Sequence, residues 1–327
     1  MKQKILITGG LGFIGHNISI ELQKEGFEVI IVDNYSHNIN QSWHKIIIDQ
    51  RVDLIKQEKI PILLADTTDG LELENIILEV KPDKIIHTAA IPDARLSNRD
   101  PSAGFNQNLL ATKILLEIIR KNELEINQFT YFSSSMIYGD FSSESVDENS
   151  EKNPKGIYGV TKLSSEMLIR AYHNLINLPY TIIRPSALYG PRCINNRVTQ
   201  IFIEKALENN PISIQGDGTQ KLDFTFIEDF VNGLVITQTN PEAINQIFNL
   251  TTGHAEPIGK LVTILKEFFS NLEISYEPWD KIVPVRGTLS IENLKSLGFK
   301  PQFRIENGYP IYIEWYLKNN KKFKIGG

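Results

Sequence analysis

The sequence predicts an α/β protein with a Rossmann-like, doubly wound parallel sheet and a smaller, interleaved C-terminal domain. Three observations predict this class. Short apolar runs rich in β-branched residues alternate with segments of helical apolar spacing, and a glycine-rich turn follows the first run directly. The 327 residues are enough for one large domain or two smaller ones. Alternating strands and helices form parallel sheets that are covered on both faces.

Six apolar runs predict strands buried on both faces, namely Lys4–Thr8, Glu28–Val32, Pro61–Ala65, Lys84–His87, Phe129–Phe132 and Thr181–Ile183. Helical apolar spacing predicts helices over Phe13–Lys24, Leu71–Val80, Phe105–Arg120, Tyr158–Leu175 and Val198–Leu207. Beyond Arg184 the alternation loosens and prolines separate shorter elements. We therefore expect a dinucleotide-binding domain over 1–184, to which 219–250 returns, and a mainly substrate-binding domain over 185–327.

Composition and charge exclude several classes of protein. Hydrophobic residues make up 41% of the chain and charged residues 22%, which is ordinary for a globular protein. Because 39 acidic residues outnumber 34 basic ones, we expect no nucleic-acid partner. No apolar run reaches 18 residues, so we expect no membrane partner. The single cysteine, Cys193, cannot form an internal disulfide, and Met1 to Lys4 leave no room for a signal peptide, so we expect a cytoplasmic protein.

A glycine-rich turn lies between the first predicted strand and the first predicted helix. Gly9 permits a tight turn, Gly12 lets backbone N–H groups approach a pyrophosphate, and Gly15 lets the helix pack closely. Asp33 ends the second strand, where its carboxylate can accept hydrogen bonds from an adenosine ribose and would repel a 2′-phosphate. No Arg or Lys follows Asp33 within ten residues, so we expect NAD rather than NADP. Asp66 ends the third strand, where it either reaches the adenine edge or is a solvated cap.

Tyr158 and Lys162 are spaced to lie one helical turn apart on the same face. An ammonium beside a phenol lowers the phenol pKa from about 10 toward neutrality, as a general base requires. The lysine can also hold the nicotinamide ribose. The preceding strand ends in Ser133–Ser135, at the carboxyl edge where open α/β sheets bind ligands. A hydroxyl there can donate to a sugar oxygen or relay a proton to Tyr158; the alternative is a polar strand end with surface serines.

Together these residues resemble the extended short-chain dehydrogenase/reductases, specifically the NAD-dependent nucleotide-sugar epimerase/dehydratase family of the UDP-glucose 4-epimerase type. The similarity covers nearly the whole chain and includes Thr8–Gly15, Asp33, Asp66, His87–Ala90, Asn108, Tyr138-Gly139, Tyr158, Lys162, Arg184-Pro185, Tyr189–Pro191 and Gly216–Asp229. The resemblance implies an NAD-dependent isomerase that acts on a nucleotide-diphosphate sugar. It also implies a homodimer formed through the predicted helices at Phe105–Arg120 and Tyr158–Leu175, unless their apolar faces are used in the core.

The resemblance further implies roles for single residues. Tyr158 is the base, Lys162 the ribose clamp and Ser134, four residues before Tyr138, the hydroxyl partner. The implied cofactor contacts, besides Tyr158 and Lys162, are Gly9, Gly12, Phe13, Ile14, Gly15, Asp33, Asn34, Asp66, Thr67, Ala89, Ala90, Asn108 and Pro185. The implied substrate contacts are Ser134, Ser135, Arg192, Arg197 and Arg286. The planar guanidinium of Arg286 suits the two oxygens of a phosphate.

Three departures from the family's pattern fall where the substrate would bind. Met136 stands where dehydratases carry the second acid of an Asp-Glu pair, and because methionine cannot transfer a proton, 4,6-dehydration is not expected. Ala187 replaces an asparagine and Leu222 an arginine that contact the substrate. Arg192 and Arg197 could substitute for these contacts or could be ordinary surface charges.

The function predicted is therefore NAD-dependent epimerisation of a nucleotide sugar at carbon 4 through a 4-keto intermediate. Two alternatives stay open. One is a 4-ketoreductase or another oxidoreductase or lyase of the family, and the other is a catalytically silent dinucleotide-binding protein. His87 is expected to be a core imidazole. The six histidines and one cysteine show no metal-ligand spacing, so no metal is expected.

Overall fold

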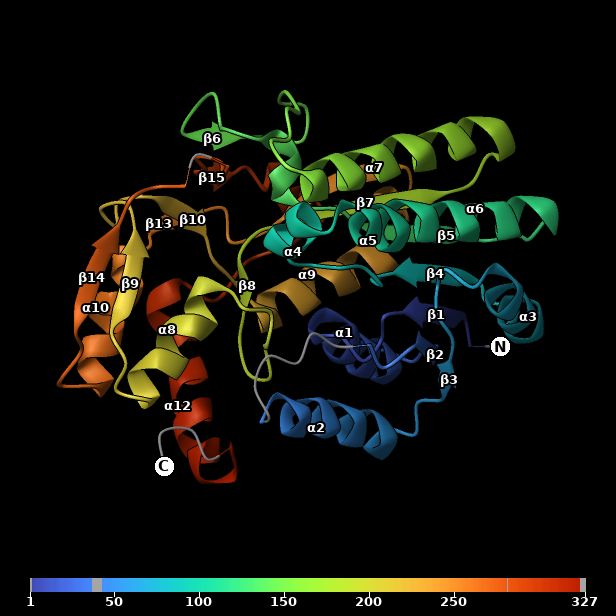
Figure 1. The fold of residues 1–327 in the computed structure, drawn as a ribbon. Coiled ribbons are helices and arrows are strands. Elements are labelled where there is room, and N and C mark those ends of the chain that lie inside the picture. The colour runs from blue at the N-terminus through green and yellow to red at the C-terminus, as the bar shows by residue number, and fades with distance from the viewer. Residues whose placement is uncertain (1, 37–42, 281, 324–327) are drawn as a thin grey trace.

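A seven-stranded sheet organises the computed structural model, which describes residues 2–36, 43–280 and 282–323 (Figure 1). Its strand order is β12-β7-β5-β4-β1-β2-β3, and every pairing is parallel. The strands are β1 (Lys4–Thr8), β2 (Glu28–Asp33), β3 (Ile62–Leu64), β4 (Lys84–His87), β5 (Gln128–Phe132), β7 (Tyr180–Pro185) and β12 (Gln246–Leu250). This arrangement confirms the doubly wound sheet. The winding direction reverses between β1 and β4, which is where such sheets bind ligands.

Helices cover both faces of the sheet, as Figure 1 shows. One face carries α1 (Phe13–Lys24), α2 (His44–Gln57) and α9 (Ile227–Thr239), and the other carries α3 (Gly70–Val80), α6 (Ala111–Lys121) and α7 (Ile157–Ile176). Successive side chains of a strand point to opposite faces. In β1, Ile5 and Ile7 therefore pack into one core and Leu6 into the other. Both faces need apolar residues, which explains why the strands are continuous apolar runs.

The rest of the chain packs smaller elements at one end of the sheet (Figure 1). Its strands pair in twos: β6 (Ser145–Val146) with β15 (Thr288–Leu289), β8 (Leu188–Tyr189) with β11 (Thr225–Phe226), β9 (Ile212–Gln215) with β14 (Ile274–Glu277), and β10 (Lys221–Asp223) with β13 (Ala255–Pro257). Its longer helices are α8 (Val198–Leu207), α10 (Gly259–Phe268) and α12 (Ile305–Phe323). Short helical turns complete the chain at α4 (Ala94–Arg99), α5 (Pro101–Phe105), η1 (Asn106–Leu110), η2 (Ser135–Tyr138), η3 (Pro241–Ala243) and α11 (Glu292–Ser296).

The chain passes between these two regions more than once. After β11 it returns to the large sheet, where α9 packs against α1 and β12 pairs with β7. It then leaves again for β13 and the elements that follow. No helix among the described residues is both long enough and apolar enough to cross a membrane.

Candidate active site

Tyr158 and Lys162 lie in the first turns of α7, beside the carboxyl end of β5. Both side chains are buried, with 6% and 3% of their surface exposed. The ammonium of Lys162 donates to the backbone carbonyl of Phe132, the last residue of β5, at 2.8 Å. It lies 5.9 Å from the ring centre of Tyr158. The start of α7 is fixed by Asn98, whose side-chain oxygen accepts from the backbone N–H of Ile157 at 2.9 Å.

Gly159 lets α7 press against the segment that follows Ser134. A Cβ at Gly159 would lie 2.8 Å from the carbonyl oxygen of Met136, so no larger residue fits without a shift. Ser134 is itself buried and caps the short helix η2, where its hydroxyl accepts from the N–H of Met136 at 3.2 Å. The serine, the tyrosine and the lysine predicted as catalytic are thus brought together by one helix start and one strand end.

The pKa of Tyr158 differs from the sequence expectation. Burial raises this pKa above its usual value, while Arg197 and a hydrogen bond from Ser134 act to lower it. Lys162 is not the cation that lowers it, because burial reduces the pKa of this lysine to about 7 and its ammonium is held by a backbone carbonyl. The expectation that Lys162 by itself brings Tyr158 toward neutrality is therefore corrected. Among the described residues, the cation that lowers the pKa of Tyr158 is Arg197, which lines the adjoining pocket.

Asn108 lies in a π-helical turn, η1, between α5 and α6. Its amide oxygen accepts from the backbone N–H of Ile91 at 2.8 Å, which ties the helix to the segment after β4. The Asn108 carbonyl accepts from the hydroxyls of Thr112 at 2.9 Å and Ser165 at 3.0 Å. Since Ser165 belongs to α7, Asn108 links the segment after β4 to the helix that carries Tyr158 and Lys162.

The glycine-rich turn between β1 and α1 forms a cradle that only glycine allows. Gly9 has a φ of +71°, and a Cβ there would lie 2.7 Å from the backbone nitrogen of Ala89. A Cβ on Gly15 would lie 2.2 Å from the Gly9 carbonyl oxygen. Helix α1 begins at Phe13 without a side-chain cap, so its first N–H groups are available to a phosphate. These features fit the pyrophosphate of NAD.

Two carboxylates mark the other end of the groove. Asp33, 7% exposed, accepts from the N–H groups of Leu11 at 3.0 Å and Tyr35 at 2.8 Å. Asp66 accepts from the side-chain amide of Asn34 at 2.8 Å. Most of the cation-free stretch after Asp33, at 37–42, lies outside the described residues. The remaining residues predicted to contact the cofactor lie along the same strand ends and loops, namely Gly12, Ile14, Thr67, Ala90 and Pro185.

A pocket of about 460 Å³ adjoins the catalytic residues. Its lining includes Met136, Ala187, Leu222, Arg197 and Arg286, so all three departures from the family's pattern fall inside it. The Nε atom of Arg286 is buried without a hydrogen-bond partner among the described residues. Burial and the neighbouring Arg197 lower the pKa of Arg286 to about 10. Neither Arg197 nor Arg286 takes part in an ion pair among the described residues, so the two guanidinium groups can bind an anion such as a diphosphate.

The sequence-predicted substrate residues do not all reach this pocket. Arg197 and Arg286 line it, whereas Ser134, Ser135 and Arg192 are not among its lining residues. The structure adds Asp93, Arg95 and Trp279, which the sequence analysis did not single out. Asp93 and Arg95 follow the carboxyl end of β4, and that position could have indicated them. Trp279 carries no comparable signal, because only folding brings Glu277, Trp279 and Arg286 to this wall.

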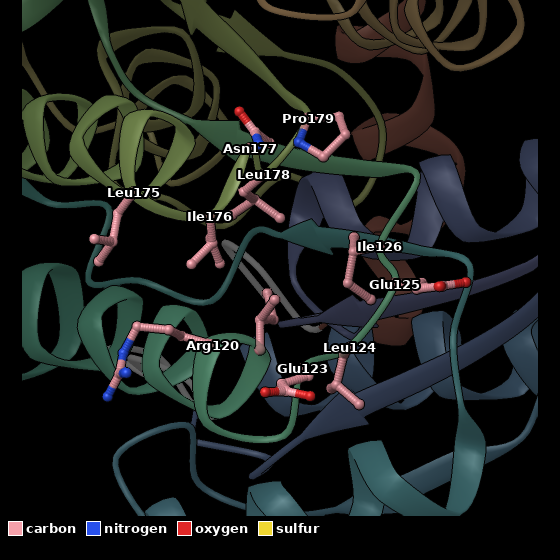
Figure 2. A pocket seen from close by; sticks show the side chains of 11 residues that line it. Arg120, Glu123, Leu124, Glu125, Ile126, Leu175, Ile176, Asn177, Leu178 and Pro179 are labelled. Atoms are coloured by element: carbon pink, nitrogen blue, oxygen red, sulfur yellow. The ribbon is translucent and has the colours of Figure 1, made fainter.

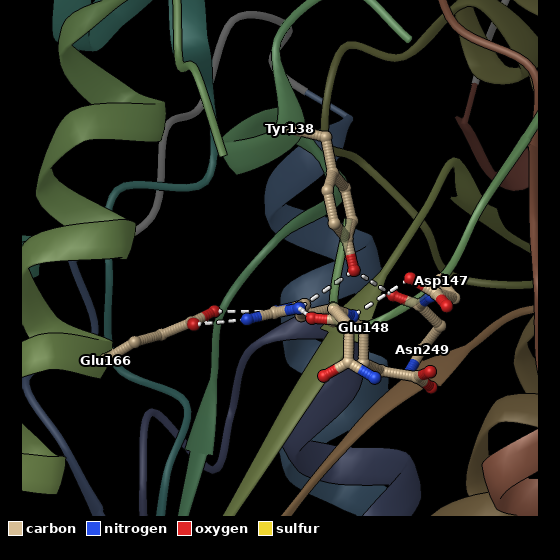
Figure 3. Close-up of polar contacts among 7 residues, drawn as sticks. Tyr138, Asp147, Glu148, Glu166 and Asn249 are labelled. Atoms are coloured by element: carbon tan, nitrogen blue, oxygen red, sulfur yellow. Dashed lines mark hydrogen bonds and ion pairs between the residues drawn. The ribbon is translucent and has the colours of Figure 1, made fainter. Parts of the chain in front are cut away.

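A buried polar cluster anchors α7 to the sheet (Figure 3). Arg184 on β7 donates to both carboxylate oxygens of Glu166 on α7, at 3.0 and 2.7 Å. It also donates to the hydroxyl of Tyr138 at 2.9 Å, which donates in turn to Asn249 on β12 at 2.7 Å. Glu148 accepts from the N–H of Asn249 at 2.7 Å. Since Glu166 lies one turn after Lys162, the cluster fixes the catalytic helix against two strands.

A second hollow, of about 550 Å³, lies where α6 and α7 end (Figure 2). Its lining residues, which include Arg120, Glu123, Leu175 and Pro179, lie just before β5 and β7 begin. It therefore sits at the opposite edge of the sheet from Tyr158, and none of the catalytic candidates line it. No group of three or more potential metal ligands occurs among the described residues.

Comparison with known proteins identifies the family. The model of the NAD dependent epimerase/dehydratase family matches residues 5–251. A relative from Methanocaldococcus jannaschii is 31% identical over 324 residues, which cover 97% of this chain and 99% of the relative. Its name gives UDP-glucose 4-epimerase as a provisional assignment. UDP-glucose 4-epimerase from Thermotoga maritima, solved with UDP-glucose, is 27% identical with a TM-score of 0.87, covering 97% of this chain and 99% of that one.

A second solved structure bears directly on the cofactor. UDP-glucuronic acid 4-epimerase from Bacillus cereus, in complex with UDP-glucuronic acid and NAD, is 25% identical with a TM-score of 0.87, covering 97% of this chain and 99% of that one. The glycine cradle and the uncapped start of α1 fit the same cofactor here. The chain belongs to the NAD-dependent epimerase/dehydratase family.

Proposed function

We propose that this protein is a nucleotide-sugar epimerase that inverts carbon 4 of the sugar. The observation that carries the proposal is that Tyr158 is buried beside Ser134, which is bonded to the backbone of Met136 on the wall of a pocket that Arg197 and Arg286 also line. Arg197 lowers the pKa of Tyr158 and Asp93 raises it, and both residues line this pocket, which supports a place for the tyrosine next to it. UDP-hexose and UDP-hexuronic acid epimerases among the similar proteins support the same substrate class.

The reaction uses the residues of the chain to move one proton and to hold two ligands. Tyr158, as phenolate, accepts the proton of the sugar 4-hydroxyl, and Ser134 donates a hydrogen bond to the same oxygen. Lys162 holds the nicotinamide ribose. Bound NAD would supply the hydride chemistry at carbon 4, and its positive charge would favour the phenolate. After the 4-keto sugar has rotated in the pocket to present its opposite face, Tyr158 returns the proton to the carbon-4 oxygen.

Epimerisation is favoured over dehydration and over net reduction for separate reasons. Met136 lines the pocket and has no proton to transfer, and it stands where the family's dehydratases carry an acid of the pair that expels water. A ketoreductase must release its dinucleotide at each turnover, whereas an epimerase retains it. A solved structure similar to this chain that contains NAD is a 4-epimerase, which supports a retained dinucleotide here.

Replacing Tyr158 with Phe tests the assigned reaction. We expect interconversion of the nucleotide sugar to fall by at least about 100-fold, because general-base catalysis contributes factors of this size. Proton NMR of a panel of UDP- and dTDP-sugars would follow the reaction, and absorbance after denaturation would measure bound NAD. Tyr172→Phe, on the same helix but outside the site, is the matched control. Turnover by Tyr158→Phe at the unaltered rate would refute the role of the base.

We also propose that the protein is a homodimer and acts in the cytoplasm. Exposed apolar side chains gather on η1 and α7, where Leu110 is 42%, Met167 65% and Leu175 68% exposed. A second copy of this face would cover them. The cytoplasmic location rests on the lone cysteine, Cys193, which is buried.

A further inference from the structure

Arg192 faces the glycine-rich turn and not the substrate pocket. Its Nε donates to Nε2 of His16 at 3.2 Å, although the two residues are 176 positions apart. The Nδ1 atom of His16 is 2.9 Å from the carbonyl oxygen of Gly12 and must donate to it, because a carbonyl only accepts. This bond fixes the tautomer, so that Nε2 is left as an acceptor for the arginine. Two hydrogen bonds therefore connect the Arg192 guanidinium to Gly12.

The backbone at Arg192 is held in this position by a second arginine. Arg51, which is 1% exposed, donates to the Arg192 carbonyl from Nη2 at 2.5 Å and from Nε at 3.2 Å. Its Nη1 lies 3.3 Å from the carbonyl oxygen of Leu11, inside the glycine-rich turn. Arg192 has a φ of +66°, in the left-handed region that side chains other than glycine rarely adopt. The buried side chain of Arg51 thus connects the glycine-rich turn to the backbone of Arg192.

The cluster of His16, Arg51 and Arg192 carries positive charge that no acidic side chain among the described residues neutralises by contact. No ion pair among the described residues involves Arg51 or Arg192. Burial, together with Arg51 and Arg192, lowers the pKa of His16 well below its usual range, so the imidazole is neutral and adds no charge of its own. The nearest acid that acts on Arg51 is Asp33, which is already engaged by backbone N–H groups. The partly buried guanidinium of Arg192 lies beside the uncapped start of α1, and both groups favour binding of an anion.

We propose that Arg192 binds the pyrophosphate of NAD and is therefore a cofactor residue, in place of the substrate contact that the sequence suggests. The family assignment supplies NAD, so the inference does not depend on which sugar is converted. Arg197, five residues further along the same loop, lines the substrate pocket beside Arg286. The loop from Gly190 to Arg197 therefore presents one arginine to each of the two diphosphates. It links cofactor retention to the wall of the substrate pocket.

A pair of matched variants tests this assignment. Arg192→Gln removes the charge at the cofactor end of the loop, and Arg197→Gln removes it at the substrate end. Three quantities are measured for each purified protein: the NAD retained per chain, released by denaturation, and the dissociation constants for added NAD and for UDP, both by calorimetry. Loss of one charge-assisted hydrogen bond predicts that Arg192→Gln weakens NAD binding by about tenfold or more with UDP binding unchanged. Arg197→Gln is expected to show the reverse pattern.

The opposite pattern overturns the proposal: normal NAD retention in Arg192→Gln together with weakened UDP binding would return this arginine to the substrate. If Arg192→Gln does not fold, as judged by circular dichroism, Arg192→Lys replaces it. Lysine keeps the charge but loses the planar fork, so NAD binding should weaken by a smaller factor; unaltered NAD binding in this variant, with weaker UDP binding, refutes the assignment. Because none of these readouts needs turnover, their failure is separate from failure of the Tyr158→Phe test.

Discussion

Two single residues, Ala187 and His87, adopt conformations or environments that cost folding free energy. Ala187 lines the substrate pocket with a φ of +37°, in the left-handed region. This conformation places the alanine Cβ too close to the following carbonyl. His87 is another such residue: it is 1% exposed, and its Nδ1 lies 2.7 Å from the hydroxyl of Thr8. Burial lowers the pKa of His87 to about 3, so the imidazole is neutral, as expected of a core histidine.

Ala187→Gly is expected to stabilise the protein. Glycine adopts a positive φ without the Cβ conflict, and after its greater unfolded-state entropy is counted the gain in unfolding free energy should be up to about 1 kcal/mol. Urea denaturation would measure it. Ala206→Gly, inside α8, is the control and should lower the unfolding free energy by about 1 kcal/mol. A destabilised Ala187→Gly would show that the backbone at this position is not strained.

The pH dependence of stability should contain a contribution from His87. The folded-state pKa lies below the unfolded value of about 6.5, so below pH 6.5 only the unfolded chain takes up this proton, and stability is lost as the pH falls. Between pH 7.5 and 5.0 this amounts to about 2 kcal/mol. His87→Asn keeps a hydrogen-bonding group near Thr8 but does not titrate. Urea denaturation at both pH values should therefore show a smaller loss in the variant; equal losses would contradict the prediction.

At the scale of elements, α7 and the predicted helix over Phe105–Arg120 show where apolar periodicity is sufficient to locate a helix and where it is not. The spacing of apolar residues located α7 to within one residue at each end, because its periodicity is unbroken. The predicted helix over Phe105–Arg120 is instead divided into α5, the π-helical η1 and α6. The division accompanies the bond from Asn108 to Ile91, a tertiary contact that periodicity does not reveal. Helix α2 was not predicted individually.

The ion pair between Glu166 and Arg184 should stabilise the docking of α7 onto β7. Glu166→Gln leaves Arg184, which is 1% exposed, without its counter-charge. We expect a loss of about 3–5 kcal/mol in unfolding free energy, measured by urea denaturation. The double variant Glu166→Leu with Arg184→Met removes both charges and should lose less. An equal or greater loss in the double variant would show that packing and not charge compensation dominates.

At the scale of the whole molecule, the two regions are joined around one groove and one pocket. The sheet supplies the glycine cradle, Ser134 and Tyr158, while the smaller elements supply Arg197 and Arg286. The chain passes between the two regions more than once, and residues of both regions line the pocket. The exposed apolar face on η1 and α7 lies outside this groove and is available for association.

Sedimentation velocity should show a dimer that depends on this face. Met167→Glu places a charge on α7 where the methionine is 65% exposed, so it should not disturb the fold but should oppose burial against a second copy. We expect the variant to sediment as a monomer at concentrations where the unmodified protein is dimeric. Lys318→Glu, on the exposed side of α12, serves as the control. A dimer that persists in Met167→Glu would place the interface elsewhere.

The sequence by itself determined the doubly wound sheet, the glycine cradle and the pairing of Tyr158 with Lys162. These features depend on alternation, on turn chemistry and on a spacing of four residues, all of which are local in the chain. Only the tertiary structure decided that Arg192 lies against His16, that Arg197 lies beside Arg286, and that burial raises the pKa of Tyr158. Contacts across many tens of residues and the exclusion of water arise only when the chain has folded, so no local pattern contains them.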